Sequence, residues 1–234
     1  KDTSPQSLEV VDVNRQRLLE RFLKYVKVDT MADVAFSSYP SSVGQLELGK
    51  LLVAELQEIG LSEVEQDENG LVWATVLPTT KKDVPTIAFN SHLDTSPETS
   101  GADVQPQVIT EYAGGDIVLN SDLSRIIKID ENPELNQLHG ATIITTDGTT
   151  LLGGDDKAGI AVITEAAAFL VEHPEIEHGP IRLLFTCDEE IGHGTDHVDL
   201  EKLAATVAYT LDGAGANDID VETFSADLAV VTIA

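Results

Sequence analysis

Three short, largely apolar runs that each lead into a histidine or an acidic residue constrain the fold of this chain more than any other feature. The runs occupy residues 86–90, 181–186 and 207–211, and their composition is typical of buried strands. Segments with helical patterns separate the runs along the chain. This alternation predicts an α/β fold, with a mixed, mostly parallel sheet flanked by helices on both faces.

Two helices and a hairpin are expected before the first of these strands. Residues 15–28 place apolar side chains at helical spacing, which predicts the first helix. The second helix is expected to begin after Ser42, with Gln45 as its partner in a capping box, and to end at Gly60. The Asn-Gly pair at residues 69–70 predicts a two-residue hairpin turn.

The rest of the chain divides simply. Residues 116–119 are expected to form a short strand, and the alanine-rich segment 158–171 a helix. We interpret residues 1–14 as a leader and residues 15–234 as one domain. Residues 227–234 have the pattern of a strand with no turn or cap after it, which favours a domain cut or truncation at least as much as a natural terminus.

The charge of the chain excludes two classes of partner. Its 41 acidic residues outnumber 14 basic ones, and a net charge of −27 repels nucleic acid phosphates and anionic membranes. A solvated acidic surface explains most of this excess, because a cation site needs only a few carboxylates. The single cysteine excludes an intrachain disulfide and fits a reducing compartment, so we expect a cytoplasmic protein without a membrane span.

Acidic residues and one histidine recur where the predicted buried strands end. They are His92 with Asp94, the pairs at 155–156 and 189–190, and Asp212. The carboxyl ends of strands in an open α/β sheet form the edge where ligands bind. We therefore expect these side chains to converge, although they lie far apart in the sequence.

Each of these residues or residue pairs can perform a chemical role at such an edge. His92 and Asp94 lie two positions apart on a strand end and point to the same side, so the carboxylate can orient a ligating imidazole. Asp155 can bridge two cations. One of Glu189 and Glu190 can bind metal while the other serves as general base.

Each piece alone also has an ordinary explanation. Asp155 could cap a helix, and the other pieces could lie in solvated turns. The glycine-rich stretch 153–159 lacks the Gly-Lys-Ser/Thr ending of a phosphate-binding loop. Taken together and in order, the pieces favour a metal site. One histidine with several carboxylates suits Zn²⁺, Mn²⁺ or Co²⁺, and zinc is the default for hydrolysis.

The remaining histidines and the cysteine suggest no comparable site. Cys187, with His193 or His197 as base, is the alternative of a cysteine hydrolase, but no nucleophile motif surrounds it, so we interpret Cys187 as a core residue or a support of the site. Surface or loop positions are expected for the other histidines, which are His139, His173 and His178.

The same motifs resemble those of the M20 metallopeptidases. Residues 91–97, 145–161, 185–192 and 208–213 are similar to the four metal motifs of that family, and the second of these is highly specific. Residues 112–117 and 138–140 resemble the tripeptidases within the family. The resemblance extends from about Arg15 to the last residue.

The resemblance implies a zinc-peptidase catalytic domain and a role for each residue. His92, Asp155 and Asp212 would bind one zinc, and Asp155 would bridge to a second zinc held by Glu190. Glu189 would be the general base and Asp94 would orient His92. The peptide bond at 155–156 would be the cis bond of the family.

The resemblance also implies what this chain lacks. Members of the family are much longer, with a lid domain inserted after the region where this chain stops and a return segment that supplies the last histidine of the second zinc. The expected domain at 15–234 is therefore incomplete, with the lid domain absent.

The expected activity is that of a two-zinc aminopeptidase that releases the N-terminal residue of short peptides, with tripeptides as the preference that the resemblance implies. A short peptide is the expected partner, and the oligomeric state, a homodimer included, stays open. The alternatives are another M20 hydrolase, such as a dipeptidase or aminoacylase, and a non-catalytic metal- or peptide-binding domain, which the missing histidine favours. We expect this chain alone to show little or no activity.

Overall fold

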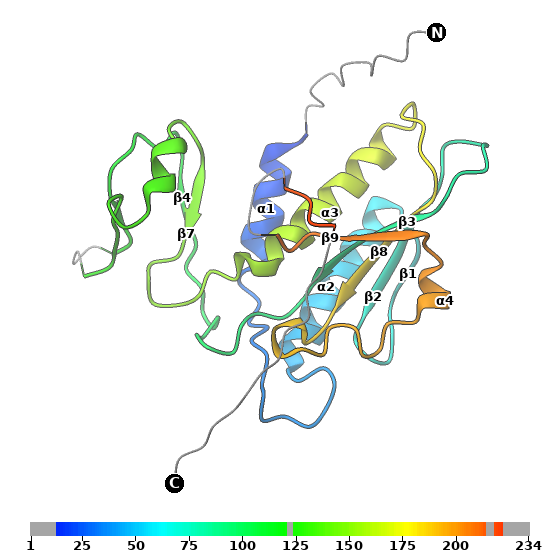
Figure 1. Cartoon of the computed structure of the whole chain (residues 1–234), viewed down its shortest axis with the longest axis horizontal. Helices are drawn as coiled ribbons and strands as arrows, with labels where there is room; N and C mark the ends of the chain where they lie inside the picture. Colours follow the sequence, from blue (N-terminus) through cyan, green and yellow to red (C-terminus); the bar gives the residue numbers. More distant parts are fainter. Residues whose placement is uncertain (1–12, 121–123, 214–217, 222–234) are drawn as a thin grey trace.

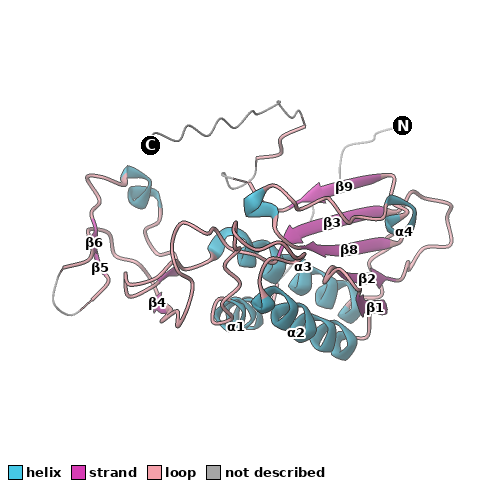
Figure 2. Cartoon of the chain, turned by 90° about the horizontal axis from the view of Figure 1, so that it is seen from below, coloured by secondary structure: helices cyan, strands magenta, loops and turns pink. Residues whose placement is uncertain are grey.

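A central sheet organises the chain in the computed structural model, which describes residues 13–120, 124–213 and 218–221. The strand expected at 227–234 lies outside the described residues, and so does all but the end of the expected leader at 1–14. In the described part the sheet has five strands in the order β1-β2-β8-β3-β9 (Figures 1 and 2). Their bounds are β1 (Ser62–Gln66), β2 (Val72–Val76), β3 (Ile87–His92), β8 (Ile181–Thr186) and β9 (Val207–Thr210).

The sheet is mixed, as the sequence predicts, with its parallel pairs grouped together. β8 and β9 both pair with β3 in parallel, whereas β2 pairs with β1 and β8 in antiparallel fashion. The register places His92 opposite Thr186 and Asn90 opposite Thr210. The three strands that lead into the candidate site residues therefore end side by side at one edge.

The three long helices lie on one face of the sheet (Figure 2). They are α1 (Arg15–Tyr25), α2 (Val43–Ile59) and α3 (Gly154–Glu172). Leu52 of α2 and Ile160 of α3 share a buried cluster with Phe185 of β8. In the described part the opposite face is covered by the short α4 (Leu200–Leu203), whose Leu203 packs with Trp73. The expectation of helices on both faces is thus met by one short helix on the second face.

Two local predictions need correction. The hairpin turn contains three residues rather than two: the Asp67 amide donates to the Leu71 carbonyl at 2.9 Å, and Gly70 takes a left-handed φ of 86°. The capping box at Ser42 does not form, because the Ser42 side chain caps no helix amide. The Gln45 side chain donates to Ser42 Oγ at 3.2 Å and to Asp188 at 2.7 Å. The stop at Gly60 is confirmed by its left-handed cap.

A smaller unit extends away from the main sheet between β3 and α3 (Figure 1). It contains its own buried cluster around Tyr112, Ile117 and Leu135, and the strand expected at 116–119 is present within it. Its elements are β4 (Gln107–Ile109), β5 (Ile117–Val118), β6 (Ile126–Ile127), the 3₁₀ helix η1 (Pro133–Gln137) and β7 (Ile143–Thr145). None of the helices in the described part combines the length and apolar character that crossing a membrane requires.

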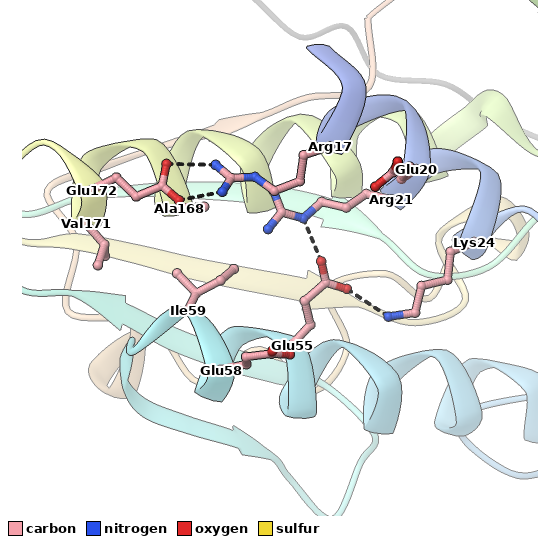
Figure 3. Close-up of a pocket in the computed structure, with 10 residues that line it drawn as sticks. All are labelled: Arg17, Glu20, Arg21, Lys24, Glu55, Glu58, Ile59, Ala168, Val171 and Glu172. Atoms are coloured by element: carbon pink, nitrogen blue, oxygen red, sulfur yellow. Dashed lines mark hydrogen bonds and ion pairs between the residues drawn. The ribbon is translucent and has the colours of Figure 1, made fainter. Parts of the chain in front are cut away.

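An ionic network joins the three long helices around a hollow of about 470 Å³ (Figure 3). Glu165 of α3 is buried and contacts both Arg17, at 2.8 Å, and Arg21 of α1. Arg21 also reaches Glu55 of α2 at 2.6 Å. Every charge in this chain of contacts has a partner of opposite sign, so we interpret the network as a connection between helices.

We expect Glu165→Gln to lower the free energy of unfolding by about 3 kcal/mol, because it leaves a buried guanidinium short of a counter-charge. The value falls at the low end for a broken buried pair because Glu55 still contacts Arg21. Glu172→Gln is the matched control: Glu172 also binds Arg17 but is 50% exposed, so its loss should cost less than about 1 kcal/mol. Urea unfolding followed by circular dichroism measures both, and equal costs would contradict the argument.

Candidate metal centre

The candidate site lies where the parallel strands end. His92 is the last residue of β3, Asp212 follows β9 by two residues, and the pair 189–190 lies in the short 3₁₀ helix η2 (Glu189–Ile191) after β8. Asp155 enters from the start of α3, which packs against β3. Four separate segments thus meet at one edge of the sheet, as expected of ligand sites in this architecture.

The imidazole of His92 is the centre of this group. Its Nε2 atom lies 2.9 Å from Asp155 Oδ1, 3.7 Å from Asp212 Oδ2 and 3.9 Å from Glu189 Oε2. His92 itself is buried, whereas Asp155, Glu189 and Asp212 are 68%, 49% and 26% exposed. The site therefore has a buried base and a side that is open to solvent.

The Asp94 carboxylate connects the end of β3 to the turn after β8. Its Oδ1 atom lies 3.3 Å from His92 Nδ1, which directs Nε2 toward the other carboxylates. The same carboxylate accepts hydrogen bonds from the amides of Glu189 and Glu190, both at 3.0 Å. Asp94 thus fixes the imidazole and the turn after β8 with one buried side chain.

Asp155 and Asp156 have different roles although they are adjacent. The peptide bond between them is cis, as expected. Asp155 points to His92, while the buried Asp156 accepts from the Ser91 hydroxyl and from the His92 and Gly159 amides. The bond from Gly159, three residues on, is of the helix-capping kind, so Asp156 performs the capping that was the ordinary explanation for Asp155.

The crowding of charge changes the titration of the site. Burial disfavours the imidazolium, but Asp94, Asp156 and Asp212 outweigh it and raise the pKa of His92 to about 10. Burial and the charges of Asp155 and Glu189 raise the pKa of Asp212 to about 6, against the opposing charge of His92. Burial first, and then the charge of Asp155, raise the pKa of Glu190. A cation would relieve these repulsions.

Three side chains fit the requirements of a metal ion. Ligand atoms of His92, Asp155 and Asp212 all lie within 4.8 Å of one another. Tetrahedral coordination with bonds of about 2.0–2.2 Å separates the donors by about 3.3–3.6 Å, and the two carboxylate oxygens lie 2.9 and 3.7 Å from His92 Nε2. One nitrogen and two carboxylates are also a suitable donor set for a catalytic zinc, which keeps a position open.

Glu190 lies outside this group of three, although the charge of Asp155 acts on it. Of the two glutamates, Glu189 is the one with a carboxylate oxygen within 4 Å of His92. The ligand role of Glu190 and the base role of Glu189 thus remain predictions.

Sequence reasoning assigned no role in the site to several buried polar residues that surround it. Lys157 donates to the Val28 carbonyl at 2.8 Å, and burial lowers its pKa to about 8. Asp188 and Gln45 bond to each other under the turn of Glu189. Finding these contacts needs the fold, because Gln45 and Asp188 are 143 positions apart.

The cysteine-hydrolase alternative finds no support in the geometry. Cys187 is buried, and burial raises the pKa of its thiol well above the usual range. His193 pairs with Asp196 at 2.7 Å, and the ring of His197 lies 4.3 Å from that of Tyr39. Cys187 is part of the core, as expected.

Known proteins resemble this chain in sequence and in structure. No protein-family model matches it. Peptidase T of Geobacillus thermodenitrificans is 51% identical over 94% of this chain and 53% of its own length. The crystal structure of aminopeptidase PepT from Bacillus cereus superposes with a TM-score of 0.60 at 29% identity, over 87% of this chain and 44% of that one. For an M20 family metallo-carboxypeptidase from Sulfolobus solfataricus the TM-score is 0.50 at 19% identity, over 85% and 37%, which shows the fold alone.

The chain therefore shares the α/β fold of aminopeptidase PepT and of an M20 family metallo-carboxypeptidase over the parts that superpose. Over the part of the molecule that it spans, the chain is a homologue of peptidase T. It spans about half the length of the curated relatives that it matches.

We expect Asp155→Asn to weaken zinc binding by more than the roughly 10–100-fold typical of losing a residue that only supports a ligand, because it replaces one of three donors, an anionic carboxylate, by a neutral amide. Asp130→Asn, an exposed position in the smaller unit, is the matched control and should bind zinc as the wild type does. Isothermal calorimetry with Zn²⁺ measures the affinities. Equal affinities in the two variants would show that Asp155 is not a ligand.

Proposed function

We propose that this chain carries the active site of a zinc-dependent aminopeptidase that releases the N-terminal residue of short peptides, tripeptides above all. The observation that supports this most is the placement of Glu189 Oε2 3.9 Å from the ring nitrogen that lies between Asp155 and Asp212. A three-donor metal group with a solvent-facing carboxylate beside it is the arrangement that metal-assisted hydrolysis needs. The similarity to peptidase T agrees with this reading.

The residues divide the work of hydrolysis in this proposal. His92, Asp155 and Asp212 would hold one zinc, and Asp155 with Glu190 would hold a second. Bound zinc would lower the pKa of a water molecule and polarise the scissile carbonyl. Glu189 would accept the proton of the attacking water and donate it to the leaving amine, so that the C–N bond breaks without net proton uptake.

Charge favours the amino end of the substrate. The carboxylates at the open side of the site attract the free α-ammonium group of a peptide and repel its carboxylate. This agrees with an aminopeptidase and gives less support to an aminoacylase, whose substrates have a blocked amine. The preference for tripeptides rests on the family.

A substrate panel tests the proposal in the full natural protein. With zinc supplied, a tripeptide should be hydrolysed at its first bond, and a dipeptide and an N-acetylated amino acid more slowly. Preference for one of the latter two would favour the dipeptidase or the aminoacylase. Stoichiometric zinc binding with no turnover of any of the three would favour a non-catalytic metal-binding domain.

We expect Glu189→Gln to lower kcat by about 10²–10⁴-fold, the usual contribution of a general base, and to leave zinc affinity within about threefold of the wild type. Glu201→Gln, at an exposed position of α4, is the control for loss of one carboxylate. Turnover and zinc content are measured on the same samples. Zinc loss as large as that in Asp155→Asn would assign Glu189 to the ligands instead.

Zinc should bind to this chain alone in two unequal steps. His92, Asp155 and Asp212 offer three donors, whereas Glu190 and the shared Asp155 offer only two, and a catalytic zinc takes about three from protein. Titration of residues 1–234 by calorimetry should give one tight site and one weak site. Two tight sites would show that further donors take part.

A further inference from the structure

The turn that carries Glu189 and Glu190 has little structure of its own. It is one short 3₁₀ segment, flanked by Asp188 and Gly192, which take left-handed φ values of 58° and 81°. Glu189 is about half exposed. The position of its carboxylate relative to His92 therefore depends on contacts from other segments.

Two buried carboxylates supply these contacts. Asp94 binds the amides of Glu189 and Glu190 from the side of β3, as described above. Asp188 binds in the opposite direction, to the residues that precede and begin α2. The turn is thus attached at its two glutamate amides and at the residue directly before them.

The carboxylate of Asp188 is held by hydrogen bonds alone. It accepts from the Ser41 amide at 2.7 Å, the Ser41 hydroxyl at 2.5 Å and Gln45 Nε2 at 2.7 Å. Asp188 is 1% exposed, and among the described residues no lysine, arginine or histidine forms an ion pair with it. A buried charge needs such donors, so each of them matters to where the turn lies.

Gln45 contacts Asp188 at two points. Its Nε2 donates to the Asp188 carboxylate, and its Oε1 accepts from the Asp188 amide at 3.0 Å. Only a side chain with both a donor and an acceptor can do this. A glutamate would place a second carboxylate against the first, and a leucine would leave the Asp188 amide unpaired.

The local sequence rule is overridden at this position. Ser42 and Gln45 have the spacing of a capping box, yet Ser42 caps no helix amide, and Gln45 Nε2 lies closer to Asp188, at 2.7 Å, than to Ser42 Oγ, at 3.2 Å. Places where a local preference is given up are often functional sites. Here the Gln45 side chain binds Asp188, the residue directly before the proposed general base Glu189.

We propose that Gln45 and Asp188 are positioning residues that hold Glu189 at its distance from the metal group, an inference that rests on Glu189 being the general base. A displacement of about 1 Å in a reacting group can cost about 100-fold in rate. The clamp formed by these two side chains therefore acts on kcat, while the affinity of the zinc site formed by His92, Asp155 and Asp212 is set by residues outside the turn.

A charge-conserving swap tests the clamp in the full natural protein. Gln45→Glu places two carboxylates together and should lower kcat by about 10–100-fold, with KM and the affinity of the zinc site formed by His92, Asp155 and Asp212 unchanged. The double variant Gln45→Glu with Asp188→Asn restores one amide facing one carboxylate, and kcat should return to within about threefold of the wild type. Gln57→Glu, the same change on the exposed face of α2, is the control.

Hydrogen exchange at the amides of Glu189 and Glu190 is the second readout, because it needs no turnover. Exchange should be faster in Gln45→Glu and return to the wild-type rate in the swap. A swap that does not recover, or a fall in kcat that only follows loss of thermal stability, would overturn the inference. A wild type without turnover would instead refute the proposed function, and the exchange rates alone would then decide whether the clamp holds the turn.

Discussion

At the carboxyl ends of the parallel strands the fold holds several carboxylates around one imidazole. These carboxylates repel one another, so the surrounding structure must stabilise their charges. The carboxylates divide into two kinds. Asp94, Asp156 and Asp188 are buried, and each accepts hydrogen bonds from backbone amides. Asp155 and Asp212 are more exposed and face the imidazole instead. The buried kind supports the backbone of the site, so the exposed kind is left available for a cation.

The position of the metal group depends on how α3 is docked. Asp155 stands at the start of that helix, where the Lys157 ammonium is fixed on the Val28 carbonyl. Within the next two turns, Ile160 and Ile163 are in the main core, and Glu165 enters the network with Arg21. The helix is thus held at its first turn, along its apolar face and by a buried charge. A change in the network would act on stability first, and on the site only through the helix.

The strands and their acidic ends could be predicted from the sequence, because a buried apolar run and the residue after it are adjacent in the chain. The strand at 181–186 was predicted to the residue. The partner of Gln45 could not be predicted in this way. Ser42 offers a local partner three residues away, whereas Asp188 becomes a partner only when the turn after β8 reaches the start of α2. The predicted length of the turn before Leu71 was also wrong, because the Asn-Gly pair is compatible with both two- and three-residue hairpins. The face on which each helix lies also depends on tertiary packing, which periodicity does not encode.

The acidic surface of the chain and the carboxylates of the site have different origins, but both attract cations. Most of the net charge of −27 belongs to the surface, while the centre needs only the few carboxylates around His92. The surface charge raises the local concentration of cations at any exposed carboxylate group, and the open side of the site is such a group. Burial and the neighbouring carboxylates raise the pKa of Asp212, and a cation held by His92, Asp155 and Asp212 would oppose both effects by favouring the ionised carboxylate. The carboxylates that repel one another around His92 are therefore the same groups that, in the proposed function, would attract a divalent ion and the ammonium end of a peptide.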